Sequence, residues 1–272
     1  MALDNPAFAR NSAFSKQGAV AGAQDLSAQQ LQEMYNQPAT PPAGETMAID
    51  TTIQKSAVAF GLLIVGAAIG WVTMQSLPFL WIGAGIVGFV LALVNIFKKE
   101  PSAPLVLAYA GVQGIFVGGI SAWYELSFGG GIVAQAVIAT LVVVGVTLAL
   151  FASGKIRASK KATKIFLVAM VGYLVFSLVN FGLMIFGATD SAFGLRSEPS
   201  FIFGIPWGVI IGIFVVIMAA YSLVLDFDFI QQGVRNRAPK KYEWSGVFGI
   251  MVTVIWLYLE ILRMLAIMSS SD

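Results

Sequence analysis

Long apolar runs separated by short polar segments dominate the chain from about residue 56 onward. Each run holds about twenty residues, the length that a helix needs to cross a hydrocarbon core roughly 30 Å thick. Because backbone groups in lipid must form their hydrogen bonds within the segment, such runs predict helices. We therefore predict an all-α integral membrane protein whose seven transmembrane helices cover residues 56–74, 80–97, 103–123, 132–152, 165–187, 205–225 and 246–268.

The first fifty residues form a polar segment rich in Ala, Gln, Ser, Pro and Asn. Residues 25–37 have the pattern of one short helix, which Pro38 would end. This composition predicts a mostly disordered N-terminal tail over residues 1–50, followed by a transmembrane domain over residues 51–272. The tail is either a solvated leader or a docking element for a partner.

Basic residues determine the predicted orientation. In a seven-helix arrangement, fourteen of the sixteen Lys and Arg residues fall on one side of the membrane. Arg196 lies alone on the other side, and Arg263 lies inside the seventh helix. By the positive-inside rule the basic side is cytoplasmic. We predict a multi-pass protein of a bacterial plasma membrane, with a cytoplasmic N-terminus and an external C-terminus.

Small residues recur at four-residue spacing within several of the predicted helices. Gly66 and Gly70 form one pair, and Gly114 and Gly118 form another. Such spacing lets two helices approach closely, either within one chain or between two copies. We favour packing within the chain.

Composition excludes several kinds of chemistry. Hydrophobic residues make up 58% of the chain and charged residues 11%, whereas a soluble domain carries roughly 25% charged residues. With no Cys and no His, the chain has no disulfide, no thiolate nucleophile and no imidazole. Neither a phosphate-binding loop nor a hydrolase motif occurs. We expect no enzymatic activity and no bound cofactor.

Three acids stand out because ionisable groups inside a membrane are costly and are usually functional. Asp226 and Asp228 lie at the predicted inner end of the sixth helix, and Glu260 lies within the seventh. At 1.5 Å per residue, we expect Asp226 and Glu260 to be separated by roughly 15–20 Å along the membrane normal.

Each acid also has a structural interpretation. Asp226 and Asp228 could form an interfacial cap that meets Lys98, Lys99 or Arg235. Glu260 and Arg263, three residues apart on one helix face, could neutralise each other. A buried Glu with a basic neighbour also suits a gated ion path, in which protonation changes the pairing.

Three segments resemble a known family. The third helix contains Tyr109, Gln113, Gly114, Gly118, Gly119 and Ser121; the sixth ends in Leu225-Asp226-Phe227-Asp228; the seventh reads Leu257-Tyr258-Leu259-Glu260, then Leu262 and Arg263. With seven helices and a basic loop after the fourth, residues 50–268 resemble the Bax inhibitor-1/YccA-like family, also called the transmembrane Bax inhibitor motif family. The start at Asn5-Pro6-Ala7-Phe8 is similar to its actinobacterial branch.

The resemblance implies a bundle in which the seventh helix is central and enclosed by the other six. Bacterial members are described as pH-sensitive calcium leak channels. An acid on the sixth helix and one on the seventh act as pH sensor and gate, which implies these roles, and transient calcium binding, for Asp226 and Glu260. Asp228, Arg263, Lys98, Lys99 and Gln113 are the residues that we expect to line the path or pair with the gate.

The chain departs from the family pattern at three points. Gln113 stands where the third helix usually carries an acid, and the acid of the seventh helix is Glu instead of Asp. The stretch from Asp226 to Glu260 is also longer than in the family, and alignment of the helix ends places the family acid near Thr253. The assignment of the sensor role is therefore firmer for Asp226 than for Glu260.

These observations lead to two functional hypotheses of different classes. The first is a pH-sensitive calcium leak channel, in which carboxylates supply the oxygen ligands that calcium prefers. The second is a membrane-embedded regulator that binds a membrane protease or another membrane partner through its tail. A secondary transporter is the weaker third reading, because no inverted repeat is evident.

Overall fold

The computed structural model describes residues 45–189, 191–200 and 204–270. The predicted tail and its short helix at 25–37 lie almost wholly outside this part of the chain. The described residues contain seven helices that are long and apolar enough to cross a membrane, as the sequence predicts. They are α4 (Ile49–Thr73), α5 (Pro78–Phe97), α6 (Ala103–Phe128), α7 (Ile132–Ala152), α8 (Lys160–Ile185), α9 (Trp207–Arg235) and α10 (Glu243–Ser269).

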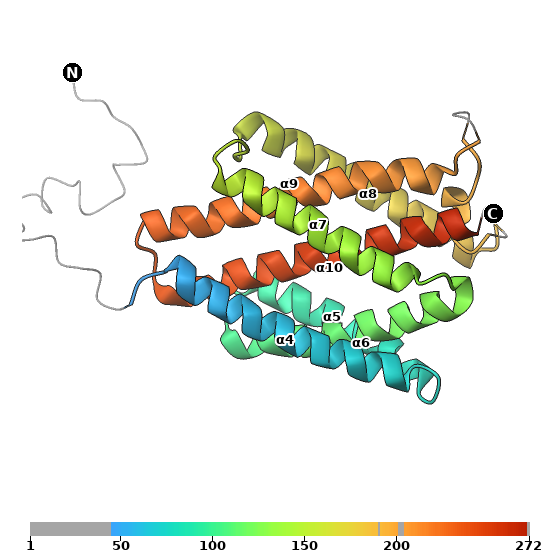
Figure 1. Ribbon diagram of the computed structural model, residues 1–272, viewed down its shortest axis with the longest axis horizontal. Helices are drawn as coiled ribbons and strands as arrows, with labels where there is room; N and C mark the ends of the chain where they lie inside the picture. Colours follow the sequence, from blue (N-terminus) through green and yellow to red (C-terminus); the bar gives the residue numbers. More distant parts are fainter. Residues whose placement is uncertain (1–44, 190, 201–203, 271–272) are drawn as a thin grey trace, which may run out of the picture. The chain divides into compact units, whose positions relative to one another are not determined.

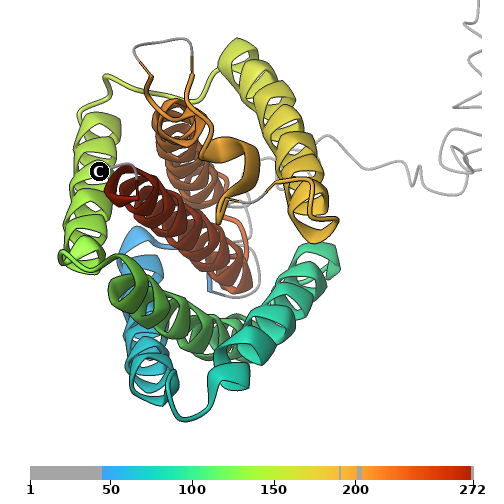
Figure 2. The ribbon, with the colours of Figure 1, turned by 90° about the vertical axis from the view of Figure 1, so that its right-hand side faces the viewer.

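The helix α10 runs through the middle of the bundle. It contacts α4, α6, α7 and α9, and Figure 2 shows it enclosed by the other helices. Within the apolar 18-residue stretch of the last helix, 56% of the residues are buried, whereas only 6% are buried in the corresponding stretch of α8. Helices that face lipid need no polar surface, so the apolar side chains of the outer helices are exposed while α10 supplies much of the core. The central position that the family resemblance implies for the seventh helix is confirmed.

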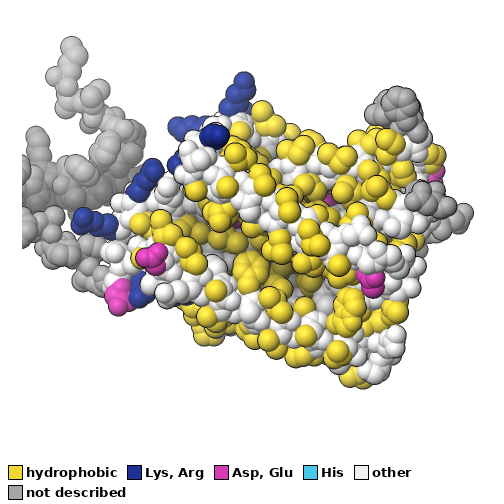
Figure 3. Space-filling model, in the orientation of Figure 1, with side chains coloured by type: hydrophobic (Ala, Val, Ile, Leu, Met, Phe, Trp, Pro, Cys, Tyr) yellow, Lys and Arg dark blue, Asp and Glu magenta, His cyan; other side chains and the backbone are white. Residues whose placement is uncertain are grey.

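Charged side chains gather at one end of the bundle, below called the basic end. It holds the start of α4, the end of α9, the start of α10 and the short 3₁₀ helix η3 (Lys240–Tyr242). Figure 3 shows Lys and Arg side chains at this end and a broad apolar surface over the middle. Trp71, Trp81, Trp123 and Trp207 all lie near helix ends at the opposite end, as an aromatic belt requires.

Several helices are longer than predicted because a helix does not stop where its apolar run stops. The helix α9 continues ten residues beyond Leu225. In this extension Ile230 packs against Gly246 of α10 and fills the space that a larger residue at position 246 would need. The predicted start of the first helix at Ser56 is also wrong, since α4 begins at Ile49. Its first turns carry Thr51 and Lys55, which pair with α10.

The glycine pairs of α4 and α6 pack against each other. A methyl group on Gly70 would overlap the carbonyl oxygen of Ile115, and one on Gly118 would overlap the carbonyl oxygen of Ala67. The two helix backbones therefore touch directly, a contact that only Gly permits. The small-residue spacing serves packing within the chain, the interpretation favoured from the sequence.

This contact predicts that Gly70→Ala destabilises the bundle. The added methyl group has backbone atoms as neighbours, which cannot move aside as a side chain can, so we expect a loss of about 1–3 kcal/mol of stability. Thermal unfolding in detergent would show a lower midpoint for Gly70→Ala.

Gly61→Ala is the matched control in the same helix. A methyl group on Gly61 meets nothing within 4 Å, so its unfolding midpoint should not fall. Equal midpoints for the two variants would contradict the close α4–α6 contact.

Candidate functional site

Asp226 points from α9 toward α10. Its Oδ2 accepts a hydrogen bond of 2.7 Å from Thr253 Oγ1, and the hydroxyl of Ser222 lies 3.2 Å from the same threonine oxygen. A methyl group on Gly249 would stand 2.6 Å from Oδ1, so the missing side chain at Gly249 leaves room for the carboxylate. The site is thus built where α9 crosses the middle of α10.

Asp226 lies deeper than the sequence analysis expects. The helix α9 ends nine residues beyond it, which corresponds to about 13 Å of helix rise. The expectation that Asp226 is close to the basic end is therefore wrong, because the helix continues through Asp228 to Arg235. Among the described residues no Lys or Arg forms an ion pair with Asp226.

Glu260 occupies a different, fully paired environment. Its Oε1 accepts from Arg196 at 3.0 Å, and its Oε2 accepts from Arg263 at 2.8 Å and from the Tyr173 hydroxyl at 2.7 Å. The side chain of Glu260 is only 2% exposed, and that of Arg196 is 4% exposed. The pairing of Glu260 with Arg263, one of the two readings of the sequence, is present.

Arg196 reaches the cluster around Glu260, which also contains Arg263 and Tyr173, from the loop after α8. The described part of this loop contains the 3₁₀ helix η2 (Gly194–Arg196), which follows α8 in the chain and brings Arg196 to Glu260 of α10. Asn180 of α8 holds η2 by accepting from the Leu195 amide at 2.8 Å and donating to the Phe193 carbonyl at 3.2 Å. Gly194 has φ +60°, and a side chain there would overlap Asn180. The turn therefore needs Gly at this position.

The cluster carries one more positive than negative charge. Two guanidinium groups face the single carboxylate of Glu260, and the Tyr173 hydroxyl accepts from Arg196 at 3.2 Å and from Arg263 at 3.3 Å. Arg196 also donates to Ser177 at 3.0 Å and lies over the rings of Tyr173 and Phe176. This region therefore disfavours a cation and ties α8, the loop and α10 together.

The two acids that the resemblance pairs do not meet. Thr253, the partner of Asp226, precedes Glu260 by seven residues, or about 10 Å of helix rise. This is less than the expected 15–20 Å, because Asp226 lies deeper than its predicted position. The structure instead brings together Asp226 and Thr253, the position that alignment of the helix ends matches with the family acid.

The other predicted site residues lie apart from Asp226. Asp228 accepts from Gln232, one turn along the same helix, and Lys98 and Lys99 are exposed beyond the end of α5. The predicted interfacial cap is thus not formed, since α9 runs on past both acids. Gln113 of α6 faces Gly88 of α5, and its Oε1 is buried without a hydrogen-bond partner.

Glu243 belongs to no recognisable sequence motif, yet it is fully buried at the basic end. Its carboxylate accepts from Lys55 and Thr51 at 2.6 Å each and from the Ala48 amide at 2.9 Å. Nearby, the Lys240 ammonium donates to Glu45 and lowers the pKa of that carboxyl. The start of α4 is thereby joined to the turn between α9 and α10.

No group of three or more His, Cys, Asp or Glu residues with the geometry of a metal site occurs in the part of the chain that the structure describes. A cation at Asp226 would have oxygen ligands from one carboxylate and from the hydroxyls of Thr253 and Ser222. Such a set is too sparse for a tight calcium site, which takes 6–8 oxygens.

The family model described as Bax inhibitor 1 like matches residues 5–270. No curated protein matches the chain in a sequence comparison.

The paired cluster predicts that Glu260→Gln destabilises the protein. Removal of the carboxylate charge leaves the buried Arg196 without a counterion, a change that typically costs about 3–5 kcal/mol. We expect a clearly lower midpoint of thermal unfolding in detergent.

Glu198→Gln provides the control, because Glu198 lies in the same loop region and is exposed. Its midpoint should equal that of the unmodified protein. A Glu260→Gln midpoint as high as that of the control would show that the cluster contributes little to stability.

Proposed function

Because the chain belongs to the Bax inhibitor 1 like family, we propose that it is a cation leak channel gated by protonation, with calcium as the permeant ion. The observation that carries the proposal is the position of Asp226. It is a carboxylate about two thirds of the way along α9, bonded to a neutral threonine of the central helix and to no Lys or Arg among the described residues.

The contrast with Glu260 supports Asp226 alone as the sensor. Glu260 is the counterion of two guanidinium groups, one of them buried, and is therefore bound into the folded structure. Protonation of Asp226 leaves no unpaired charge behind. In this chain the gate is therefore Asp226 with Thr253, and Glu260 holds the closed bundle together.

The charged cluster accounts for a closed path at the end opposite the basic end. A cation that passed Asp226 along α10 would next meet Arg196 and Arg263, whose combined charge exceeds that of Glu260. Opening requires Arg196 and its loop to move away from α10. The membrane is proposed to be the bacterial plasma membrane, with the basic end in the cytoplasm.

Calcium flux into dye-loaded proteoliposomes between pH 5 and pH 8 tests the proposal. A divalent cation needs the charged carboxylate, so the leak of the unmodified protein should fall as the pH is lowered. Asp226→Asn should give a low leak that no longer changes with pH.

Asp228→Asn is the matched control. It makes the same chemical change two residues away, at a carboxylate that bonds to its own helix, and should keep the pH dependence. The same pH profile for Asp226→Asn and the unmodified protein would exclude Asp226 as the sensor. Absence of flux above empty liposomes at every pH, from folded protein, would overturn the channel proposal.

The alternative function is a regulator that binds a membrane protease or another membrane protein. One observation favours it: residues 45–48, near the end of the predicted tail, bond to Glu243 at the start of α10 and to Ala238 in the turn before it. A partner that pulled on the tail would act on the start of the central helix. Deletion of residues 1–44 should abolish such regulation and leave a leak channel conducting.

A further inference from the structure

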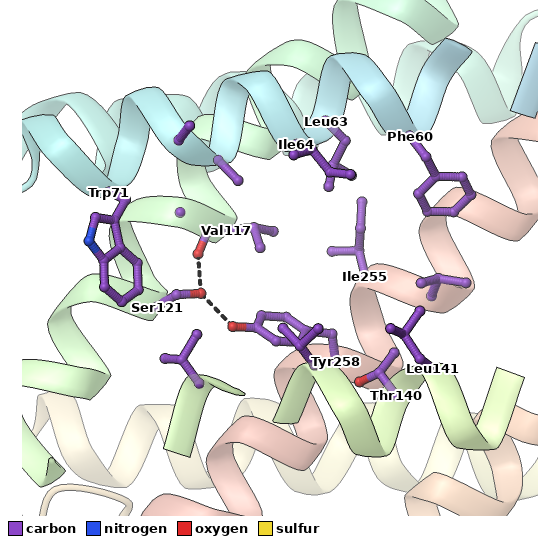
Figure 4. Close-up of a pocket in the computed structure, with 16 residues that line it drawn as sticks. Phe60, Leu63, Ile64, Trp71, Val117, Ser121, Thr140, Leu141, Ile255 and Tyr258 are labelled. Atoms are coloured by element: carbon purple, nitrogen blue, oxygen red, sulfur yellow. Dashed lines mark hydrogen bonds between the residues drawn. The ribbon is translucent and has the colours of Figure 1, made fainter. Parts of the chain in front are cut away.

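An apolar crevice of about 490 Å³ opens between α4 and α7. Figure 4 shows α4 on one side, α7 on the other, and side chains of α6 and α10 between them. Ile64 and Leu141 lie on the two sides, and Ile255 and Tyr258 of the central helix form part of the floor. The crevice therefore leads from the outer surface of the bundle to its central helix.

The hydroxyl groups that line the crevice form hydrogen bonds within the protein. The Ser121 hydroxyl donates to the Val117 carbonyl at 2.6 Å and shares a second hydrogen bond of 2.6 Å with the Tyr258 hydroxyl. The Thr140 hydroxyl donates to the Ala136 carbonyl at 2.7 Å. With these groups satisfied, water gains little in the crevice and an apolar occupant is favoured.

The mouth of the crevice is continuous with the lipid-facing surface. Ile64 and Leu141 are each 65% exposed, as expected of side chains in contact with hydrocarbon. Along α4 the lining extends from Phe60 to Trp71, eleven residues or about 16 Å of helix rise. This length is close to half of a ~30 Å hydrocarbon core, the depth of one leaflet.

We propose that this crevice binds one acyl chain of a bilayer lipid, from the leaflet at the α4–α5 turn. The volume of about 490 Å³ over about 16 Å gives a mean cross-section of about 30 Å². A helix about 10 Å in diameter has a cross-section near 80 Å² and is too wide to enter. A single flexible hydrocarbon chain matches both the width and the length.

The bound chain would contact the central helix beside the candidate gate. Val254 and Ile255 line the crevice, and they directly follow Thr253, the hydrogen-bond partner of Asp226. Lipid composition thereby acts on α10 from the face opposite the Asp226 contact. The binding site itself does not depend on the channel proposal.

Photolabelling tests the proposal. The full chain is reconstituted in liposomes that contain phosphatidylcholine with a diazirine on one acyl chain, irradiated, and mapped by peptide mass spectrometry. Label is expected on Ile255 and Tyr258, which are only 5% and 8% exposed and touch lipid through the crevice. Ala68→Phe, which fills the crevice from α4, should reduce this labelling at least fivefold.

Ala57→Phe is the matched control, because Ala57 is exposed on the same helix and does not line the crevice. It should leave the floor labelling unchanged, and both variants should unfold at the temperature of the unmodified protein. Label confined to outward residues such as Ile64 and Leu141 would overturn the proposal. So would floor labelling that Ala68→Phe does not reduce. Neither result bears on calcium flux, so the two proposals fail separately.

Discussion

Every polar side chain on the central helix must find its partner inside the protein, because the helices around it face lipid. Four contacts meet this requirement along α10: Glu243 with Lys55 near its start, Thr253 with Asp226 in its middle, and Tyr258 with Ser121 and Glu260 with Arg196 farther along. Each contact joins α10 to a different neighbouring segment. The position of the central helix, and with it the geometry of the candidate gate, depends on these pairs.

Two carboxylates of similar chemistry have different roles because their partners differ. Two guanidinium groups and a hydroxyl fix Glu260, so its charge is part of the folded structure. Asp226 accepts from the Thr253 hydroxyl and forms no ion pair among the described residues, so the other charges of the bundle stay paired whether or not this acid carries a proton. The two acids that the resemblance pairs are thus replaced here by one acid and a threonine, and in the proposed channel a single carboxylate carries the sensor role.

The apolar runs predicted all seven helices, and the span over residues 132–152 agrees at both ends, because hydrocarbon thickness constrains length and composition together. Hydropathy failed where a helix continues past its apolar run, as α9 does, and this error placed Asp226 too near the basic end. The role of Arg196 depends on how a loop folds onto α10, which no local pattern encodes. The one indication in the sequence was that Arg196 is the single basic residue predicted on its side of the membrane.

The packing of the bundle indicates which part can rearrange. The backbones of α4 and α6 touch through their glycines and cannot slide without steric overlap. In contrast, α8 buries almost nothing in the bundle and is held mainly by polar contacts of Tyr173, Ser177 and Asn180 with the loop that carries Arg196. Polar contacts of this kind can be exchanged for others at low cost, whereas close-packed backbones cannot. A transition that withdraws Arg196 from Glu260 therefore moves α8 and its loop against a fixed α4–α6 pair.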